Sequence, residues 1–417
     1  MMRIAVCLEL GAGLGHLCRV EPVVRLLQRN RAAITVVSPA GADSREVLGA
    51  LDVELRPAPP HGPRAEQAAA PSHTYGQNLR RNGYGDEHWL ADTLRRWVAL
   101  LGELAPSLVV TEHAPAALLA ARALDLPRAV LGTGFSLPPD EVPMPGLQPW
   151  FRVPESYLQT AEAATVADVN RGLTAAGLPP IQAVRDIFAG ARRFLCTVPE
   201  LDHYGPRPSE RYWGVAHSSP FSARPRWPSG GRPRIFFYLG GGHRHLDGLL
   251  GELGKRRLAA LGYVPGLTRP DRRALARDTV RLAAEPIDSA WAPATCDCVV
   301  THGGSWSQAA LLRGKPVLAL PQQLEQAVWS YRAGAQGLAT VVSILDRAPD
   351  WHRRISELTS AALRDRVAAF SGRYTQRFPH GCCGAELCAA LLPKEHPAPR
   401  EAPQQLDETD DDIRRNV

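Results

Sequence analysis

The chain has 417 residues, of which 45% are hydrophobic and 22% are charged, and its formal net charge is +6. This length predicts two domains, each large enough for a core of its own. Arginines are scattered rather than clustered, and no apolar run reaches about 18 residues, so the sequence argues against a nucleic-acid-binding protein and against a transmembrane helix.

Short apolar runs alternate with amphipathic stretches in the first half of the chain. We expect strands at 3–10, 33–38, 107–111 and 128–132, and helices at 17–29, 87–104 and 114–124. Strands and helices that alternate at this spacing predict a parallel sheet with helices on both faces.

The alternation restarts after a stretch rich in Pro, Arg, Ser and Gly at 218–234. There we expect strands at 234–240, 298–301 and 316–320, and helices at 244–261, 270–282 and 307–313. The two halves predict an α/β protein with two Rossmann-like domains, residues 1–217 and 218–395, that face each other across a cleft. Such folds bind ligands at the carboxyl ends of their strands, so the cleft is the expected site.

Three segments lack a regular pattern. Residues 396–417 combine prolines with an acidic run and predict a disordered tail. Residues 57–75 predict a mobile loop. Residues 137–160 form a long connection with several prolines and aromatic residues, and long loops in compact domains are often functional.

The cysteine pattern argues against a zinc site. Neither Cys296-Asp-Cys298 nor Cys382-Cys383 has the paired spacing of zinc ligands, so we expect the eight cysteines to be small buried residues and no metal to be bound. The chain starts directly on a strand-like run, without the pattern of a signal peptide, which favours a cytoplasmic location.

A glycine-rich loop, Gly11-Ala-Gly13-Leu-Gly15-His16, follows the first expected strand. An NAD-type site would need a third glycine where His16 stands, and an acidic residue at the end of the second strand, where Ser38 stands. Two interpretations of His16 remain. It is either a general base at the mouth of the cleft or a residue that caps or packs a helix start.

The stretch 296–326 carries the most chemistry. An expected strand leads into His302-Gly303-Gly304, and a helix follows. The free N–H groups of that helix and its dipole predict a diphosphate site, with hydroxyls from Ser305 and Ser307. Glu325 and Gln326 follow the next strand and offer an acceptor and an amide to sugar hydroxyls.

This stretch resembles the donor signature of the UDP-glycosyltransferase superfamily. The matching residues are His302-Gly303-Gly304-x-x-Ser307, Gly314-x-Pro316 and Pro321-x-x-x-Glu325-Gln326, together with the Gly15-His16 loop, Thr111-Glu112-His113-x-Pro115 and Leu131-Gly-Thr-Gly-Phe-Ser136, which are similar to bacterial natural-product members. The resemblance covers nearly the whole chain except the tail.

The resemblance implies a GT-B fold and an inverting transfer that needs neither metal nor cofactor. By this resemblance His16 is the general base and Glu112 orients it. The implied donor-binding residues are Gly15, Gly241, His302, Gly303, Gly304, Ser305, Ser307, Glu325, Gln326 and the backbone near Pro286 and Ile287. The expected acceptor-binding residues are His113, Phe135 and Trp150, with the connection 138–157 as the acceptor wall.

Two positions depart from the family pattern. Ala310 stands where the family usually has a Glu that binds the ribose, and Trp306 stands where plant members have Asn. Trp291 lies too close to His302 to take the place of the base-stacking Trp of plant members, so we expect it in the core.

The sequence thus predicts transfer of a hexose from a UDP- or dTDP-sugar to a hydroxyl of a small, apolar acceptor. A degenerate nucleotide-sugar-binding protein, favoured by Ala310, and a nucleotide-sugar epimerase are the alternatives. We expect no nucleic-acid partner and at most peripheral membrane contact, and the acceptor, the sugar and the oligomeric state stay open.

Overall fold

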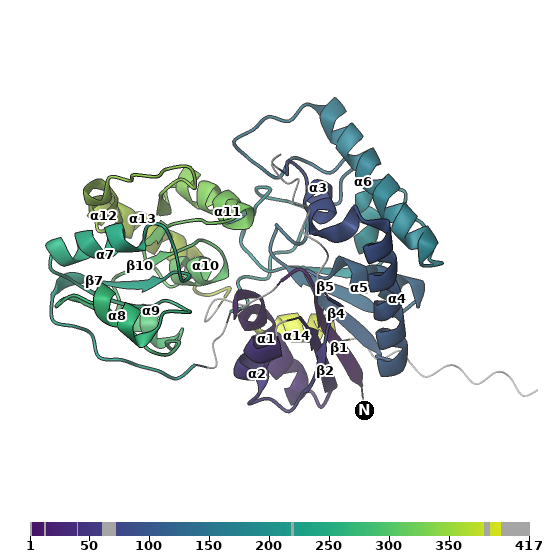
Figure 1. Cartoon of the computed structure of the whole chain (residues 1–417), viewed down its shortest axis with the longest axis horizontal. Helices are drawn as coiled ribbons and strands as arrows, with labels where there is room; N and C mark the ends of the chain where they lie inside the picture. Colours follow the sequence, from purple (N-terminus) through teal and green to yellow (C-terminus); the bar gives the residue numbers. More distant parts are fainter. Residues whose placement is uncertain are drawn as a thin grey trace, which may run out of the picture.

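The computed structural model describes residues 2–11, 14–39, 41–60, 72–217, 221–378 and 384–392. The predicted acidic tail, Cys382, Cys383 and most of the predicted loop at 57–75 lie outside these residues. Two parallel α/β sheets, each covered by helices, form the two halves of the molecule (Figure 1).

The first sheet has six parallel strands in the order β3-β2-β1-β4-β5-β6. These strands are β1 (Arg3–Leu8), β2 (Ala33–Ser38), β3 (Glu54–Pro57), β4 (Leu108–Glu112), β5 (Arg128–Gly132) and β6 (Arg192–Leu195). Its larger helices are α1 (Leu14–Arg29), α2 (Gly41–Leu48), α4 (Glu87–Leu104), α5 (Pro115–Ala123) and α6 (Glu155–Ala175). The short helix α3 (Tyr75–Leu79) lies near α6.

The second sheet repeats this topology, with the order β12-β11-β10-β7-β8-β9. Its strands are β7 (Gly231–Tyr238), β8 (Leu258–Tyr263), β9 (Val280–Leu282), β10 (Cys298–Thr301), β11 (Val317–Ala319) and β12 (Ala339–Val341). Its helices are α7 (Leu246–Lys255), α8 (Arg269–Leu275), α9 (Trp291–Thr295), α10 (Ser305–Leu312), α11 (Leu324–Ala335), α12 (Trp351–Leu358) and α13 (Ala361–Tyr374). The α/β class and the two Rossmann-like sheets are therefore confirmed.

The central strands are buried along almost their whole length because helices cover both faces of each sheet. In β1, every residue after Arg3 is buried, and β4 and β10 are buried throughout. Alternate residues of β1 enter different cores: Ile4 and Val6 pack towards α1, whereas Ala5 and Cys7 pack towards α4 and α5. This two-sided burial is typical of parallel sheets.

Two helix predictions in the second half are wrong in part. The expected helix at 244–261 ends at Lys255, and its last residues belong to β8. The expected helix at 270–282 ends at Leu275, and its last residues form β9. In both cases the expected helix extends past the end of the observed helix and into the strand that comes next in the chain. The connection expected at 137–160 also ends earlier, because α6 begins at Glu155.

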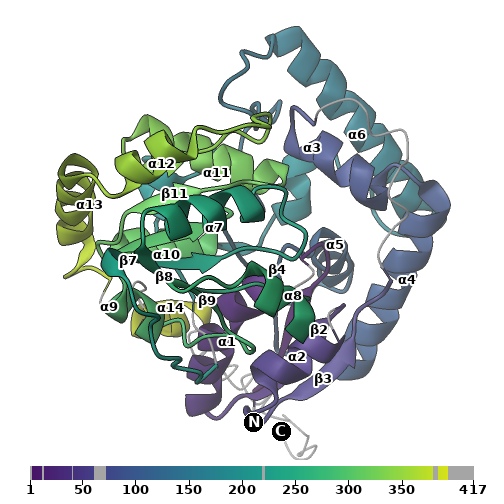
Figure 2. The ribbon, with the colours of Figure 1, turned by 60° about the vertical axis from the view of Figure 1, so that its left-hand side comes forward.

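The last described helix, α14 (Gly384–Leu391), returns to the first half of the molecule. It lies beside α1 in both overall views (Figure 1, Figure 2). Leu387, Cys388 and Leu391 join the core of the first sheet, and Arg192 donates hydrogen bonds to the carbonyls of Ala390 and Leu391. Helix α14, which follows the second half in the chain, thus ties the two halves together. No helix in the described ranges is both long enough and apolar enough to cross a membrane.

Candidate active site

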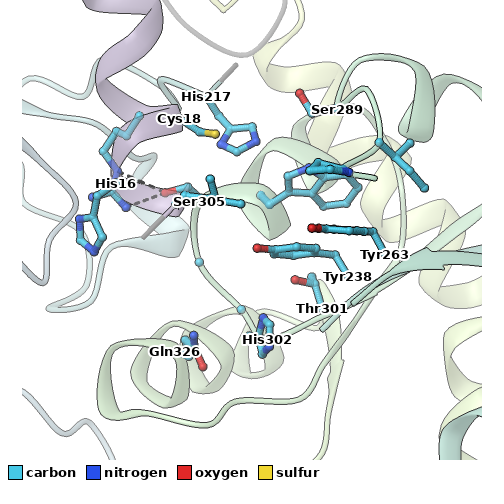
Figure 3. A pocket seen from close by; sticks show the side chains of 18 of the residues that line it. His16, Cys18, His217, Tyr238, Tyr263, Ser289, Thr301, His302, Ser305 and Gln326 are labelled. Carbon is cyan, nitrogen blue, oxygen red and sulfur yellow. Dashed lines mark hydrogen bonds between the residues drawn. The ribbon is translucent and has the colours of Figure 1, made fainter. Parts of the chain in front are cut away.

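One cavity of about 330 Å³ lies where the two sheets face each other. Its wall includes residues that follow β1 and β10 and the end of β7, inner strands beside the points where the strand order of each sheet reverses. Open α/β sheets bind ligands at such points. Nine predicted site residues line this cavity: Gly15, His16, Ile287, His302, Gly303, Gly304, Ser305, Glu325 and Gln326 (Figure 3).

His16 and Glu112 form a hydrogen-bonded pair at the first sheet. His16 lies in the first turn of α1, and Glu112 is the last residue of β4, two segments that meet because β1 and β4 are neighbours. His16 Nδ1 lies 2.7 Å from Glu112 Oε2. The Glu112 side chain is fully buried, whereas that of His16 is 17% exposed.

The electrostatics of this pair suit a base. Burial opposes the charge of Glu112, but His16 and Arg19 outweigh it and lower the pKa of Glu112 to about 2. Glu112 is therefore ionised at neutral pH and accepts the Nδ1 proton of His16. Burial also opposes a charge on His16, but Glu112 outweighs burial and raises the pKa of His16. With Nδ1 as donor, Nε2 of the neutral ring keeps a lone pair that can accept a proton.

Arg19 is a site residue that the sequence analysis missed. It lies one turn after His16 on α1, is buried, and lines the cavity. Its guanidinium hydrogen-bonds Glu112 through Nη1 and Ser305 through Nε and Nη2, so it joins the two halves of the molecule. The signal in the sequence was the i, i+3 spacing, which places both side chains on one helix face.

The loop between β10 and α10 is shaped for an anion. Gly303 and Gly304 have φ angles of 96° and 120°, which favour glycine. A Cβ on Gly303 would lie 2.7 Å from Ser330 Oγ, so the loop also needs glycine for space. No side chain caps α10, since its N-cap residue is Gly304. The first N–H groups of α10 therefore face the cavity and carry the positive end of the helix dipole.

His302 is held as a neutral hydrogen-bond donor. The backbone N–H of Gly240, just after β7, donates to its Nε2 over 2.7 Å. Burial and the nearby His243 lower the pKa of His302 to about 4. The proton of the neutral ring therefore sits on Nδ1, which is free to donate to a ligand.

The start of α11 brings two polar side chains to the cavity. Gln326 Oε1 accepts the N–H of Gln322 over 2.9 Å, which leaves its amide nitrogen as a donor. Glu325 Oε1 lies 3.9 Å from Arg19 Nη2, and its side chain is 15% exposed. The pair offers one acceptor and one donor, as recognition of sugar hydroxyls requires.

Aromatic side chains line the other end of the cavity, and the sequence analysis did not single them out for this role. They are Phe221, Phe236, Tyr238, Tyr263 and Trp306. Tyr238 and Tyr263 end the neighbouring strands β7 and β8 and stack with centroids 6.3 Å apart (Figure 3). Trp306 stacks on Phe236 at 5.0 Å. Pro286 and Ile287 complete this flat apolar surface, which suits a nucleobase.

Two predicted donor residues do not line the cavity. Ser307 is fully buried on the core side of α10. Gly241 packs on the backbone of Pro265, where a Cβ would lie 2.5 Å from the carbonyl oxygen. Their roles in donor binding stay predictions. Ala310 is also buried in α10 away from the cavity, and Trp291 packs against the core and Trp227.

The three expected acceptor residues lie outside this cavity in two places. His113 stacks beside His16 with ring centroids 6.1 Å apart, and it contacts Phe135 edge-on at 6.0 Å. Burial lowers the pKa of His113 to about 3, so the ring is neutral. Trp150 lies further away, against Tyr331 of α11 at 5.6 Å. His113 thus lies next to the base His16, and Phe135 lies behind His113.

Comparison with known proteins gives structural relatives. No protein-family model and no curated protein matches the sequence. The glycosyltransferase SnogD from Streptomyces nogalater is 20% identical, with a TM-score of 0.63 over 93% of this chain and 99% of that one. SsfS6 from Streptomyces sp. SF2575 is 17% identical, with a TM-score of 0.64 over 94% and 99%.

The glycosyltransferase VinC, solved in complex with dTDP, is 14% identical, with a TM-score of 0.63 over 94% of this chain and 98% of that one. These relatives span almost the full length of the described residues and share both sheets. The chain therefore has the two-domain GT-B fold of the bacterial natural-product glycosyltransferases.

Proposed function

We propose that this protein is an inverting glycosyltransferase that moves a hexose from a UDP- or dTDP-sugar to a hydroxyl of a small, apolar acceptor, without a metal or cofactor. One observation carries the proposal. A histidine–carboxylate pair and an uncapped helix N-terminus face each other across one cavity, His16–Glu112 on one side and α10 on the other.

The cavity divides into regions that match the parts of a nucleotide sugar. The aromatic end would take the base, the Gly303-Gly304 loop with Ser305 and His302 the diphosphate, and Glu325 with Gln326 the sugar. The dTDP-bound structures of VinC, SsfS6 and SpnG favour this donor class. The assignment of these regions to base, diphosphate and sugar rests on the lining of the cavity as a whole rather than on any single residue.

In the proposed reaction, His16 Nε2 takes the proton of the acceptor hydroxyl while its oxygen attacks the anomeric carbon of the sugar. The bond from that carbon to the diphosphate oxygen breaks, and the diphosphate keeps the electron pair. Glu112 stabilises the imidazolium that forms, and the N–H groups of α10 stabilise the leaving diphosphate. A single displacement of this kind inverts the anomeric centre.

The compartment, the side from which the acceptor enters and the partners are part of the same proposal. The cysteines that the structure describes are free and buried, which supports a reducing compartment such as the cytoplasm. His113 beside the base, with Phe135 against it, favours an acceptor site that enters from the first domain. We propose no nucleic-acid partner and at most peripheral contact with a membrane.

The test is transfer itself. UDP-glucose and dTDP-glucose are incubated with a panel of hydroxylated aromatic and aliphatic acceptors, and mass spectrometry detects products that carry one added hexose. The proton coupling at the anomeric carbon reports inversion, and added chelator reports metal dependence. Donor binding without transfer to any acceptor would indicate the binding protein. Conversion of the donor to an isomeric sugar without an acceptor would indicate an epimerase.

A further inference from the structure

Arg19 joins the base to the donor loop. Its Nη1 contacts Glu112, which holds His16, and its Nη2 donates to Ser305 Oγ over 2.6 Å. Ser305 is the first residue of α10 and lies 286 positions further along the chain. The guanidinium therefore connects the two halves of the molecule at the cavity wall.

The guanidinium keeps hydrogen-bonding capacity for a ligand. It has five N–H donors, and its contacts with Glu112 and Ser305 use three of them. Glu325 is too distant, at 3.9 Å, to accept a direct hydrogen bond from Nη2. Among the described residues, two N–H groups of Arg19 thus have no protein acceptor, although the side chain is buried.

Arg19 places a cation beside the N-terminus of α10. The N-terminus of a helix carries partial positive charge, so a cation there is repelled, whereas an anion is stabilised. Arg19 nevertheless touches Ser305 at the first position of α10. Glu112 and Glu325 balance the charge of Arg19, but Glu112 also hydrogen-bonds His16 and Glu325 lies 3.9 Å away. An anionic group bound between the guanidinium and α10 would satisfy both positive groups.

We propose that Arg19 binds the diphosphate of the donor beside the N-terminus of α10 and, through Glu112, couples that diphosphate to the base His16. This inference rests on the proposed glycosyl transfer and adds a residue to it. As the bond from the anomeric carbon to the diphosphate breaks, the leaving oxygen gains negative charge next to Arg19. The proton of the acceptor goes to His16, whose positive charge is balanced by Glu112.

The first test compares a ligand that carries the diphosphate with one that lacks it. The variants are Arg19→Gln, Arg19→Lys and, as a control, Arg25→Gln on an exposed part of α1. Binding of dTDP and UDP is measured by calorimetry, and binding of thymidine and uridine by ligand-observed NMR. A lost charge-assisted hydrogen bond should weaken diphosphate binding by about 10- to 100-fold.

The nucleosides separate a ligand contact from a structural role. Arg19→Gln should leave thymidine and uridine binding unchanged, because the aromatic end of the cavity is intact. Arg19→Lys keeps the charge but loses the planar fork, so its loss of diphosphate affinity should be smaller. The proposal is overturned if Arg19→Gln binds the diphosphates like the Arg25→Gln control, or if both variants of Arg19 weaken nucleosides and diphosphates equally.

The second test follows His16 itself. The charged groups near its ring are Glu112 on β4, Arg19 on α1 and Glu325 on α11, and the neighbouring His113 is neutral. Arg19 lowers the pKa of His16 against the two carboxylates. NMR titration of the labelled imidazole should therefore give a higher pKa in Arg19→Gln than in the wild type. An unchanged or lower pKa would contradict the coupling.

A folding defect must be distinguished from a loss of ligand binding, and failure of this inference from failure of the proposed function. Circular dichroism checks that each variant is folded. If Arg19→Gln is not, Arg19→Lys still tests diphosphate binding, with a smaller loss of the same sign. If the wild type binds neither diphosphate, the proposed function fails, and this inference fails with it. If the wild type binds dTDP or UDP and transfers sugar but the folded Arg19 variants match the Arg25→Gln control, only the inference fails.

Discussion

Replacing Glu112 with Gln should change the titration of His16. The substitution keeps the shape of the side chain but removes the charge that accepts the Nδ1 proton of His16 over 2.7 Å. Because Glu112 is fully buried, water screens this interaction little. Arg19 then remains near His16 without its main counter-charge, which favours the neutral ring further.

The size of the effect follows from the hydrogen bond. A hydrogen bond to a charged group contributes about 1.5–3 kcal/mol, and one pKa unit corresponds to about 1.4 kcal/mol. The pKa of His16 should therefore fall, because the charge of Glu112 is what raises it. The base works in its neutral form, so the acid limb of kcat/KM should move to lower pH by the same amount. The plateau should fall by about 10²- to 10⁴-fold, because the ring is a weaker and less well oriented base.

NMR titration of labelled histidines gives the pKa directly, and release of nucleoside diphosphate from the donor sugar gives kcat/KM as a function of pH. Glu9→Gln is the matched control, since Glu9 is a buried carboxylate after β1 whose partners are Tyr84 and the start of α5. The reasoning is refuted if Glu112→Gln leaves the pKa of His16 and the acid limb where they are in the wild type.

Three further predictions use other parts of the molecule. His16→Ala should lower turnover by about 10²- to 10⁴-fold, while calorimetry still detects donor nucleotide binding; unchanged turnover would end its assignment as the base. Gly303→Ala should destabilise the fold by about 1–3 kcal/mol and weaken dTDP binding, because the φ of 96° and the closeness of Ser330 exclude a side chain. A variant with the denaturant midpoint and the dTDP affinity of the wild type would disprove this. Burial raises the pKa of Glu9 from 4.5 to about 7. Between these two pH values the folded protein keeps a proton on Glu9 that the unfolded chain has lost. The free energy of unfolding should therefore fall by about 3 kcal/mol as pH rises from 4.5 to 7. Glu9→Gln cannot ionise and should therefore be more stable than the wild type near pH 8 and equally stable near pH 5, as denaturant unfolding would measure; the same difference at both pH values would argue against this account.

The strands and the donor loop could be predicted because their signals are local. Continuous apolar runs such as 298–301 are dictated by burial on both faces of a parallel sheet, and the Gly303-Gly304 pair by its backbone geometry. Strands β3, β6 and β12, of three or four residues each, were not predicted, and β8 and β9 were taken for the ends of expected helices. The position of α14 could not be foreseen, since it depends on contacts with α1 that lie far away in the sequence.

In the site, too, residues with a local sequence signal could be predicted, and residues that depend on long-range contacts could not. His16 and Glu325 belong to segments with recognisable patterns, and the structure brings both to one cavity. Arg19 carries no pattern of its own, because its importance comes from Glu112 and Ser305, which only the fold brings to it. The aromatic wall is likewise assembled from separate segments, with Tyr238 and Tyr263 on neighbouring strands.

The shift in melting temperature with nucleotides tests the central claim most directly. UDP, dTDP, GDP and NAD are each added to the wild type at millimolar concentration. A ligand at about 100 times its dissociation constant stabilises the folded state by about 2.7 kcal/mol, which raises the midpoint by several degrees. A shift with UDP or dTDP, and none with NAD, is the result expected of a nucleoside-diphosphate-sugar site. No shift with UDP or dTDP would contradict the account.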